Sequence, residues 1–344
     1  MAITVTVVRH AERRAATQPA GCDSDDVAMA FTEATIDDLL REVYVAIRKG
    51  GQPVSSTREP SHELIGVSLE LTAPRCRLSR TETRRSSRAG IAELGWYLSG
   101  TTDPAMIVHW VERYQREVEE DGTIHGAYGP RMFGTGDNAQ FDTVLRLLAN
   151  SSSSRRAVIQ LFDASDLTGP VRYQDVPCTS TLQFFVRDSR LHLIVTMRSN
   201  DAFVGLPLDV FVFTMLQELM AGELGVDIGR YIHNVGSLHI YDSVANKIEE
   251  FLDEGWQSTD TPMPAMPPRS LTRHVPKFLA AEQQIRDGVL FAGVSLPSDP
   301  YWADLARMLA LTEARRRDEV DADEVAAIKS SIAAPFFSEF LRRD

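Results

Sequence analysis

The most constraining feature of this 344-residue chain is a strongly apolar helical stretch from Phe211 to Leu224. It is well short of the roughly 20 apolar residues that a helix needs to span a bilayer. A helix that is apolar around most of its circumference is stable in water only when other elements cover it. We therefore expect this segment to be the buried centre of a globular core.

Helical and strand-like segments alternate around this stretch without an internal repeat, which predicts a mixed α+β fold. The expected helices cover 36–48, 88–98 (closed by Gly100) and 141–148. The expected strands cover 64–71, 157–162, 182–186 and 191–197. The last two strands are expected to form a hairpin around 188–190. We expect an N-terminal extension at 1–33 and a catalytic domain at 34–250. A largely helical C-terminal extension at 251–344, with a linker-like 261–268, is expected to pack on or continue that domain.

Charge and cysteine content exclude several classes of protein. A net charge of −12 argues against a nucleic-acid polymer as partner, because phosphate backbones are bound by broad basic surfaces. The apolar runs are too short for a membrane span, and the first residues lack the order of a secretory signal. Cys22, Cys76 and Cys178 have neither disulfide-framework nor metal-site spacing. We therefore expect a cytoplasmic protein with no metal ion.

Cys178 is the candidate nucleophile. It follows Pro177 at the entry to the first hairpin strand, and Arg198 stands twenty positions later at the end of the second. If the hairpin pairs as expected, the second strand returns the arginine towards the cysteine. A neighbouring cation lowers the pKa of a thiol and so increases the thiolate fraction that can attack a substrate.

The segment around Cys178 resembles the active-site core of the thymidylate synthase family. Its residues are Val176-Pro177-Cys178, then LQFFV, then MRSNDAFVGLPLDVF. Four further stretches match that family in the same order: AELGWYLSGTTD (92–103), GAYG (126–129), SRR (154–156) and NVGSLHIY (234–241). The resemblance covers roughly residues 35–245. It implies a thymidylate synthase-like α+β fold, in which helices pack on a mixed sheet.

The resemblance also implies roles for individual residues. Cys178 would attack C6 of a pyrimidine mononucleotide, Glu93 would move protons at the base, and Tyr128 would belong to the catalytic water network. The side chains implied for the nucleotide are Arg58, Arg155, Arg156, Arg198, Ser199, His239 and Tyr241. Asp201 and Gly205 are implied for the cosubstrate 5,10-methylenetetrahydrofolate. Because the Arg155–Arg156 pair of this family reaches across a dimer interface, we expect a homodimer with shared active sites.

One departure from the family concerns recognition of the base. Thymidylate-making members carry Asn eleven positions after the core arginine, where this chain has Asp209. An Asn amide matches uracil, because it accepts from N3–H and donates to O4. An ionised Asp has only acceptors, which suit the N4 amino group of cytosine and an N3 that is protonated after addition at C6. In this family the substitution marks the cytidylate hydroxymethylases, so Asp209 is a candidate catalytic and substrate-binding residue.

Other departures agree with this interpretation. Thr179 replaces the usual His after the nucleophile, Ser237 replaces an Asp near the ribose-binding His, and the chain ends in FFSEFLRRD instead of a short apolar tail that excludes water. The chain most resembles the CMP hydroxymethylases of nucleoside-antibiotic pathways. We therefore expect 5-hydroxymethyl-CMP and tetrahydrofolate as products. The alternatives are dCMP hydroxymethylation and, more remotely, dUMP methylation by a thymidylate synthase.

Three other classes fit the sequence less well. Arg9-His10-Ala11-Glu12 faintly resembles the strand-end motif of histidine phosphatases, but that reading leaves the core run unexplained. A zinc cytidine deaminase needs Pro-Cys-x-x-Cys, and the segment that begins at Pro177 has no second cysteine. A catalytically inactive nucleotide-binding scaffold would not need Cys178, Glu93 and Arg198 together.

Overall fold

A computed structural model of the chain describes residues 29–55, 59–84, 87–136, 139–168, 173–258, 261–317 and 319–341. Within these residues, seven strands form one sheet with the order β1-β3-β7-β6-β5-β4, and β2 also pairs with β3. The strands are β1 (Met29–Glu33), β2 (Gln52–Ser55), β3 (Pro60–Leu71), β4 (Val158–Gln160), β5 (Thr179–Arg187), β6 (Arg190–Asp201) and β7 (Asp227–Tyr241). The pairs β1–β3 and β6–β7 are parallel and the others antiparallel, so the expected mixed sheet is confirmed.

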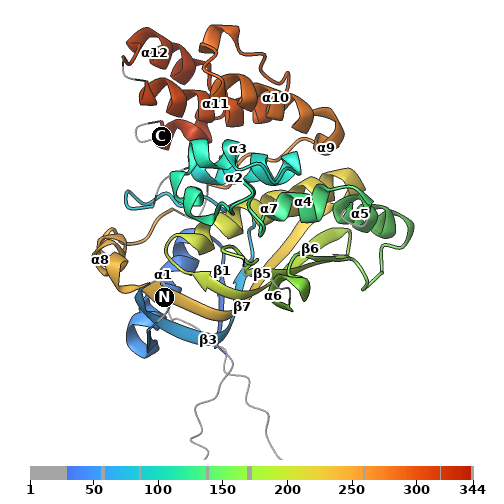
Figure 1. The fold of residues 1–344 in the computed structure, drawn as a ribbon, viewed down its shortest axis with the longest axis vertical. Coiled ribbons are helices and arrows are strands. Elements are labelled where there is room, and N and C mark those ends of the chain that lie inside the picture. Colours follow the sequence, from blue (N-terminus) through green and yellow to red (C-terminus); the bar gives the residue numbers. More distant parts are fainter. Residues whose placement is uncertain are drawn as a thin grey trace, which may run out of the picture.

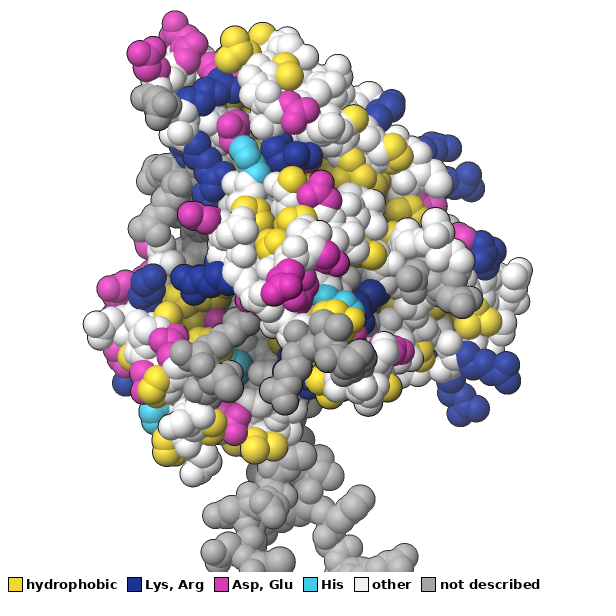
Figure 2. Space-filling view, viewed as in Figure 1, with side chains coloured by type: hydrophobic (Ala, Val, Ile, Leu, Met, Phe, Trp, Pro, Cys, Tyr) yellow, Lys and Arg dark blue, Asp and Glu magenta, His cyan; other side chains and the backbone are white. Residues whose placement is uncertain are grey.

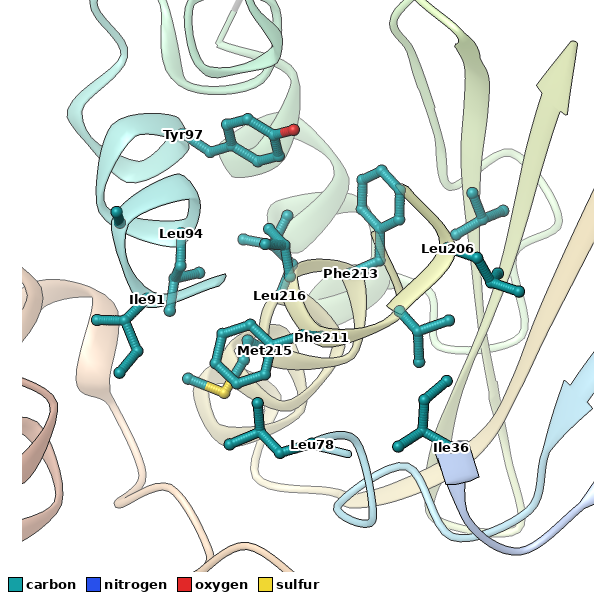
Figure 3. Close-up of a cluster of buried hydrophobic side chains, with 14 of the residues drawn as sticks. Ile36, Leu78, Ile91, Leu94, Tyr97, Leu206, Phe211, Phe213, Met215 and Leu216 are labelled. Carbon is teal, nitrogen blue, oxygen red and sulfur yellow. The ribbon is translucent and has the colours of Figure 1, made fainter. Parts of the chain in front are cut away.

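Helix α7 (Gly205–Leu224) is the centre of the core, as its apolar sequence predicts. It begins six residues before the expected start and ends at Gly225, whose φ of 67° is in the left-handed region that glycine adopts without strain. Figure 3 shows Phe211 and Leu216 of this helix on the side of Ile91 and Leu94, which come from a second helix, and Phe213 on the side of Leu206. Helix α7 also packs on β6 and β7, so it links the sheet to the helices above it.

The remaining helices of the catalytic part are α1 (Ile36–Gly50), α2 (Arg88–Ser99), α3 (Ala105–Trp110), η1 (Glu112–Glu117), α4 (Tyr128–Phe133), α5 (Gln140–Asn150), α6 (Ser165–Thr168) and α8 (Ala245–Asp253), with the single turn η3 (Asp242–Val244) before α8. Of these, α1, α2 and α5 lie close to the expected positions, and the others were not predicted. The side chain of Thr35 accepts a hydrogen bond from the Asp38 backbone and caps α1. Gly100 closes α2 with a φ of 65°, as expected from its place in the sequence.

The expected hairpin is confirmed, and its turn is tighter than expected. Arg187 pairs with Arg190, so only Asp188 and Ser189 connect β5 to β6. Their φ angles are 50° and 57°, the left-handed values of a two-residue hairpin turn. The two-residue turn sets the register of most of the β5–β6 pair, and an irregularity between Thr179 and Thr181 shifts it by one residue before Cys178. The turn and this shift together place Arg198 opposite Cys178.

The C-terminal part forms a layer of helices above α2 and α3 (Figure 1). It contains α9 (Ser270–Arg273), α10 (Val275–Arg286), η4 (Phe291–Gly293), α11 (Pro300–Arg316), α12 (Ala322–Ser331) and η5 (Pro335–Glu339). Helices α10 and α11 contact α2 directly. The expectation of a linker at 261–268 is wrong, because Met263 and Met266 are buried and their backbone N–H groups donate to Arg75 O and Glu218 Oε1.

Charges are dispersed over the surface. Figure 2 shows arginine and lysine side chains interspersed with acidic ones over the visible face, without one broad basic field. In the part of the chain that the structure describes, no helix has the length and apolar character needed to cross a membrane.

Candidate active site

The β5–β6 hairpin places Arg198 beside Cys178. The Arg198 backbone N–H donates to Cys178 O at 2.8 Å, so the two residues lie side by side at the open end of the hairpin. The guanidinium donates to the carbonyl oxygens of Pro177 (3.1 Å) and Val176 (2.9 Å) and is thereby held against the segment that leads into Cys178. Neither of the two described cysteines, Cys76 and Cys178, is in a disulfide, and Cys178 is only half-buried.

Tyr128 lies at the start of α4 and contacts the residue after the cysteine. Its hydroxyl oxygen accepts a hydrogen bond from the Thr179 backbone N–H at 3.0 Å. Burial raises the pKa of the Tyr128 hydroxyl well above its usual value, and the nearby Cys178 and Asp209 act in the same direction. The group therefore stays a neutral phenol next to the thiol. The Thr179 side chain is fully buried, and its hydroxyl has no partner among the described residues.

Glu93 lies on α2 and is only 4% exposed. The Tyr114 hydroxyl donates to its Oε1. Burial raises the pKa of the Glu93 carboxyl, while the positive charge of Arg113 and the hydrogen bond from Tyr114 lower it in part. Burial thus makes Glu93 a better proton acceptor than an exposed carboxylate, while Arg113 and Tyr114 stabilise its ionised form.

Arg113 and Tyr114 belong to η1 and were not predicted as site residues. Nothing in the sequence around Glu112–Glu117 resembles a motif, and the approach of η1 to Glu93 arises only when α3 packs against α2. The rings of Trp96 and Tyr114 make an edge-to-face contact with their centroids 5.5 Å apart, and the ring centroids of Tyr97 and Tyr128 lie 5.2 Å apart. Aromatic rings thus surround the carboxylate.

Asp209 lies in the second turn of α7. Burial raises the pKa of its carboxyl well above the usual value; the nearby Glu93 raises it further, and Arg113 opposes the shift. The residue keeps part of its surface accessible although protein packs around its carboxyl. The sequence suggests an ionised Asp209, whereas a desolvated carboxyl beside a second carboxylate is shifted towards its neutral form.

The ends of β6 and β7 bring the other expected nucleotide ligands together. Ser199 is paired with Ser237, and Asp201 with His239. The rings of His239 and Tyr241 point from the same face of β7 and lie 4.8 Å apart. Ser237, which stands where the family has Asp, donates to the carboxylate of Glu63 on β3, so its hydroxyl hydrogen-bonds within the sheet.

Asp201 caps the turn that leads into α7. Its Oδ1 accepts from the backbone N–H groups of Phe203 (2.8 Å) and Val204 (3.2 Å). Oδ2 accepts no hydrogen bond from any residue in the described ranges. A Cβ at Gly205 would lie 2.6 Å from the Asn200 side-chain oxygen, so only glycine fits there without displacement. The Arg84 guanidinium lies 4.6 Å from the Phe203 ring centroid. Arg84 and Phe203 line a pocket of about 320 Å³, together with Glu82, Thr83, Lys247 and Glu250.

Two of the expected phosphate ligands are not brought to Cys178 of their own subunit. Arg155 and Arg156 are exposed in the loop before β4. The neighbouring Ala157 accepts a hydrogen bond from Phe184 N, six residues along β5 from Cys178, which corresponds to about 20 Å. An arginine side chain cannot span that distance. Arg58 lies outside the described residues. The described ranges also contain no group of three or more His, Cys, Asp or Glu side chains that could hold a metal ion.

The chain is similar over most of its length to one known family. The family model described as thymidylate synthase matches residues 47–278. The chain is 30% identical over 194 residues to thymidylate synthase 1 of Bacillus spizizenii strain W23, an alignment that covers 53% of this chain and 67% of that protein. It is 31% identical over 194 residues to the thymidylate synthase of Bacillus phage phi3T and 30% identical over 191 residues to thymidylate synthase 1 of Bacillus subtilis strain 168, with the same coverage.

Proposed function

Since the chain belongs to the thymidylate synthase family, we propose that it transfers a one-carbon unit to C5 of cytidine monophosphate and leaves it as a hydroxymethyl group. The family binds a pyrimidine nucleotide and uses methylenetetrahydrofolate as cosubstrate. The observation that carries the proposal is Asp209, a carboxyl close to Glu93 and to Tyr128, which in turn lies beside Cys178. The deoxynucleotide dCMP is the close alternative substrate.

A carboxyl at position 209 matches cytosine in either protonation state. Neutral cytosine presents the N4 amino donor and the N3 acceptor. A neutral Asp209, with one O–H donor and one acceptor oxygen, complements both groups. After the thiolate adds at C6, N3 becomes more basic and takes the proton, and the resulting carboxylate accepts from N3–H and from N4. One proton shared between Asp209 and N3 therefore serves both stages.

Cys178 supplies the covalent step. Its thiolate adds to C6, which converts the poorly nucleophilic C5 of a neutral cytosine into an enamine-like carbon. Arg198 is held beside Cys178 and favours the thiolate through its positive charge. Methylenetetrahydrofolate supplies the one-carbon unit to C5 when it is bound. Glu93, poised by Arg113 and Tyr114, is positioned to move a proton at the base and to orient water.

The residues near Asp201 fit a folate. Asp201 Oδ1 is engaged by the turn, so Oδ2 remains available to accept from N–H donors of a pterin. The pocket beside Phe203 carries Arg84 and Lys247, cations that suit the carboxylates of a glutamyl tail. Its volume of about 320 Å³ is within the usual range for ligand pockets. The glycine at 205 leaves room for the Asn200 side chain below this site.

Arg155 and Arg156 support the proposal of a homodimer. Both lie about 20 Å from Cys178 of their own subunit and are exposed, so any role in phosphate binding has to be played in a second copy. The face of the sheet opposite α7 carries Ile65, which is 78% exposed, and partly exposed Phe185, Ile194 and Ile232. A partly apolar open sheet face is suited to pairing with an identical face about a two-fold axis.

A second candidate function is methylation of dUMP. The named relatives are thymidylate synthases, and a neutral Asp209 presents one donor and one acceptor, as an Asn amide does. With its proton on the other oxygen, the same carboxyl would match uracil. The two functions differ in the base that is turned over and in the fate of the one-carbon unit.

The proposal is tested by assaying CMP, dCMP, UMP and dUMP side by side with methylenetetrahydrofolate. We expect turnover of the cytosine nucleotides and little turnover of the uracil nucleotides. Asp209→Asn should shift the preference towards uracil, because an amide donates to O4. Equal rates on both bases in the wild-type enzyme would exclude a base-reading role for Asp209. A cytoplasmic location and a role in nucleoside-antibiotic synthesis stay predictions.

A further inference from the structure

A chain of buried polar side chains lies behind Asp209. Asn200, Tyr231 and His233 are at most 3% exposed. The Tyr231 hydroxyl lies 2.7 Å from His233 Nδ1, and the Asn200 amide lies 3.0 Å from His233 Nε2. The Asn200 side chain also hydrogen-bonds to the Asp209 carboxyl, and Asn200 Oδ1 and Asp209 Oδ2 both lie beside Gly205. The residues come from β6, β7 and α7, so only the folded structure joins them.

The direction of this chain follows from the donors and acceptors available. In the described residues, the Tyr231 hydroxyl has His233 Nδ1 as its hydrogen-bond partner, so it donates there. Burial lowers the pKa of His233 to about 3, so the ring is neutral at working pH. A neutral imidazole that accepts at Nδ1 carries its hydrogen on Nε2. His233 therefore donates from Nε2 to Asn200.

The orientation of the Asn200 amide is determined by this donor. With Nδ2 turned towards His233, Nδ2 also donates to Met197 Sδ at 3.1 Å, a weak thioether acceptor. In this orientation Oδ1 is buried without a hydrogen-bond partner among the described residues. With the two ends exchanged, which preserves the shape of the amide, Oδ1 accepts from His233 and Nδ2 donates to Asp209. An unsatisfied buried acceptor costs about 1–3 kcal/mol. The second orientation is therefore the stable one, and the hydrogen bonds run from Tyr231 to His233 to Asn200 to Asp209.

We propose that Asn200, oriented by His233 and Tyr231, is a positioning residue that decides which oxygen of Asp209 accepts and which donates, and so which pyrimidine base the site takes. The inference rests on the proposed base-reading role of Asp209. An oxygen that receives the Asn200 N–H stays an acceptor, so a proton bound by Asp209 resides on the other oxygen. Cytosine and uracil require the donor and acceptor in opposite orders, so a fixed order fits only one of them.

The other charged groups around Asp209 do not provide this order. Glu93, Arg113 and Asp201 act on the carboxyl through their charge. A charge shifts the equilibrium between the acid and the carboxylate but does not distinguish one oxygen from the other as a directed hydrogen bond does. Removing these hydrogen-bonded side chains should therefore let the Asp209 carboxyl present its donor and acceptor in either order. Discrimination between cytosine and uracil should then fall by more than the activity does.

The test compares the ratio of kcat/KM for CMP to kcat/KM for UMP, or for dCMP to dUMP if the deoxynucleotide is preferred. Asn200→Leu and His233→Leu should lower this ratio by about tenfold or more, which corresponds to one mispaired buried polar group. His233→Gln should largely preserve it, because the Gln side-chain nitrogen can replace Nε2 as donor. Tyr231→Phe removes a single oxygen and should lower the ratio several-fold, because His233 can then carry its hydrogen on Nδ1.

Gln217→Leu is the matched control. Gln217 lies on the same helix as Asp209 and is fully buried, and its side-chain nitrogen donates to Leu191 O at 2.8 Å and to Arg230 O at 3.1 Å. The Gln217→Leu variant should lose stability without a change in the ratio of kcat/KM values for the two bases. An unchanged ratio in Asn200→Leu, or in Tyr231→Phe if the leucine variants do not fold, would overturn the inference. A wild-type enzyme that does not discriminate between the bases would instead overturn the proposed function.

Discussion

The indole N–H of Trp110 donates to Glu282 Oε1 at 2.7 Å, which ties the C-terminal helices to the active-site side of the molecule. Trp110 ends α3, immediately before the segment that carries Arg113 and Tyr114. Glu282 lies on α10, just beyond the region that the family model matches. Both residues are almost fully buried, and Arg286 pairs with the same carboxylate at 3.0 Å. The C-terminal helices thus support the segment that contacts Glu93.

This contact predicts that Trp110→Phe lowers both stability and kcat. The change removes one of the two donors of Glu282 Oε1, since Arg286 Nε also donates to that oxygen. A lost hydrogen bond to a charged group costs about 1.5–3 kcal/mol in the free energy of unfolding. It also loosens the segment that orients Glu93, so kcat should fall while the KM for the nucleotide changes little. Urea unfolding and steady-state kinetics measure the two effects.

Trp302→Phe provides the control for Trp110→Phe. Trp302 is also fully buried, and its N–H donates to Ser270 Oγ at 2.8 Å within the C-terminal layer. The Trp302→Phe variant should lose about as much stability as Trp110→Phe but keep the kcat of the wild-type enzyme. An equal loss of kcat in both variants would mean that the extension contributes only general stability.

The raised pKa of Asp209 predicts that Asp209→Asn stabilises the protein at alkaline pH. In the unfolded chain Asp209 ionises near its ordinary pKa, whereas in the folded protein burial favours the neutral acid. Between those two pKa values the folded state binds more protons, so the wild-type protein loses stability as the pH rises. The variant lacks this loss and should gain at least about 1 kcal/mol relative to wild type between pH 5 and pH 8. Urea unfolding at both pH values measures this change. If the Asp209 carboxyl had its usual pKa, the difference in the free energy of unfolding between wild type and variant would be the same at both pH values.

The distance between Arg156 and Cys178 predicts complementation between two inactive variants. Cys178→Ala and Arg156→Ala should each be inactive or nearly so. After mixing and subunit exchange, about a quarter of wild-type activity should return, because about half of the dimers are hybrids with one intact site. Mixing Cys178→Ala with a Cys178→Ala/Arg156→Ala double variant should restore nothing. A fully active monomer in analytical ultracentrifugation would contradict shared sites.

The fate of the one-carbon unit separates hydroxymethylation from methylation. We expect tetrahydrofolate as the folate product, no absorbance rise from dihydrofolate, and incorporation of ¹⁸O from labelled water into the hydroxymethyl group. Cys178→Ala should abolish turnover, because C5 stays a poor nucleophile without addition at C6. Glu93→Gln should slow turnover while nucleotide binding is retained. Stoichiometric dihydrofolate with a 5-methylated base would identify a methylase.

The sequence alone determined the local elements and the family. The apolar stretch at Phe211–Leu224 specified the central helix, because a segment without a polar face has to be covered on all sides. The spacing of Cys178 and Arg198 predicted their contact, because a tight hairpin brings residues at its two ends together. The place of Asp209, eleven positions after Arg198, could also be read directly from the chain.

Only the tertiary structure decided the electrostatic state of the site. The sequence suggested an ionised Asp209, but protonation depends on burial and on Glu93, which comes from α2, more than a hundred residues earlier. The sequence also missed Arg113 and Tyr114, since their role depends on the packing of η1 against α2. The chain from Tyr231 through His233 to Asn200 likewise joins two strands through side-chain contacts that no local pattern records. Local propensity and periodicity act between neighbours in sequence, whereas desolvation and buried hydrogen bonds act between neighbours in space.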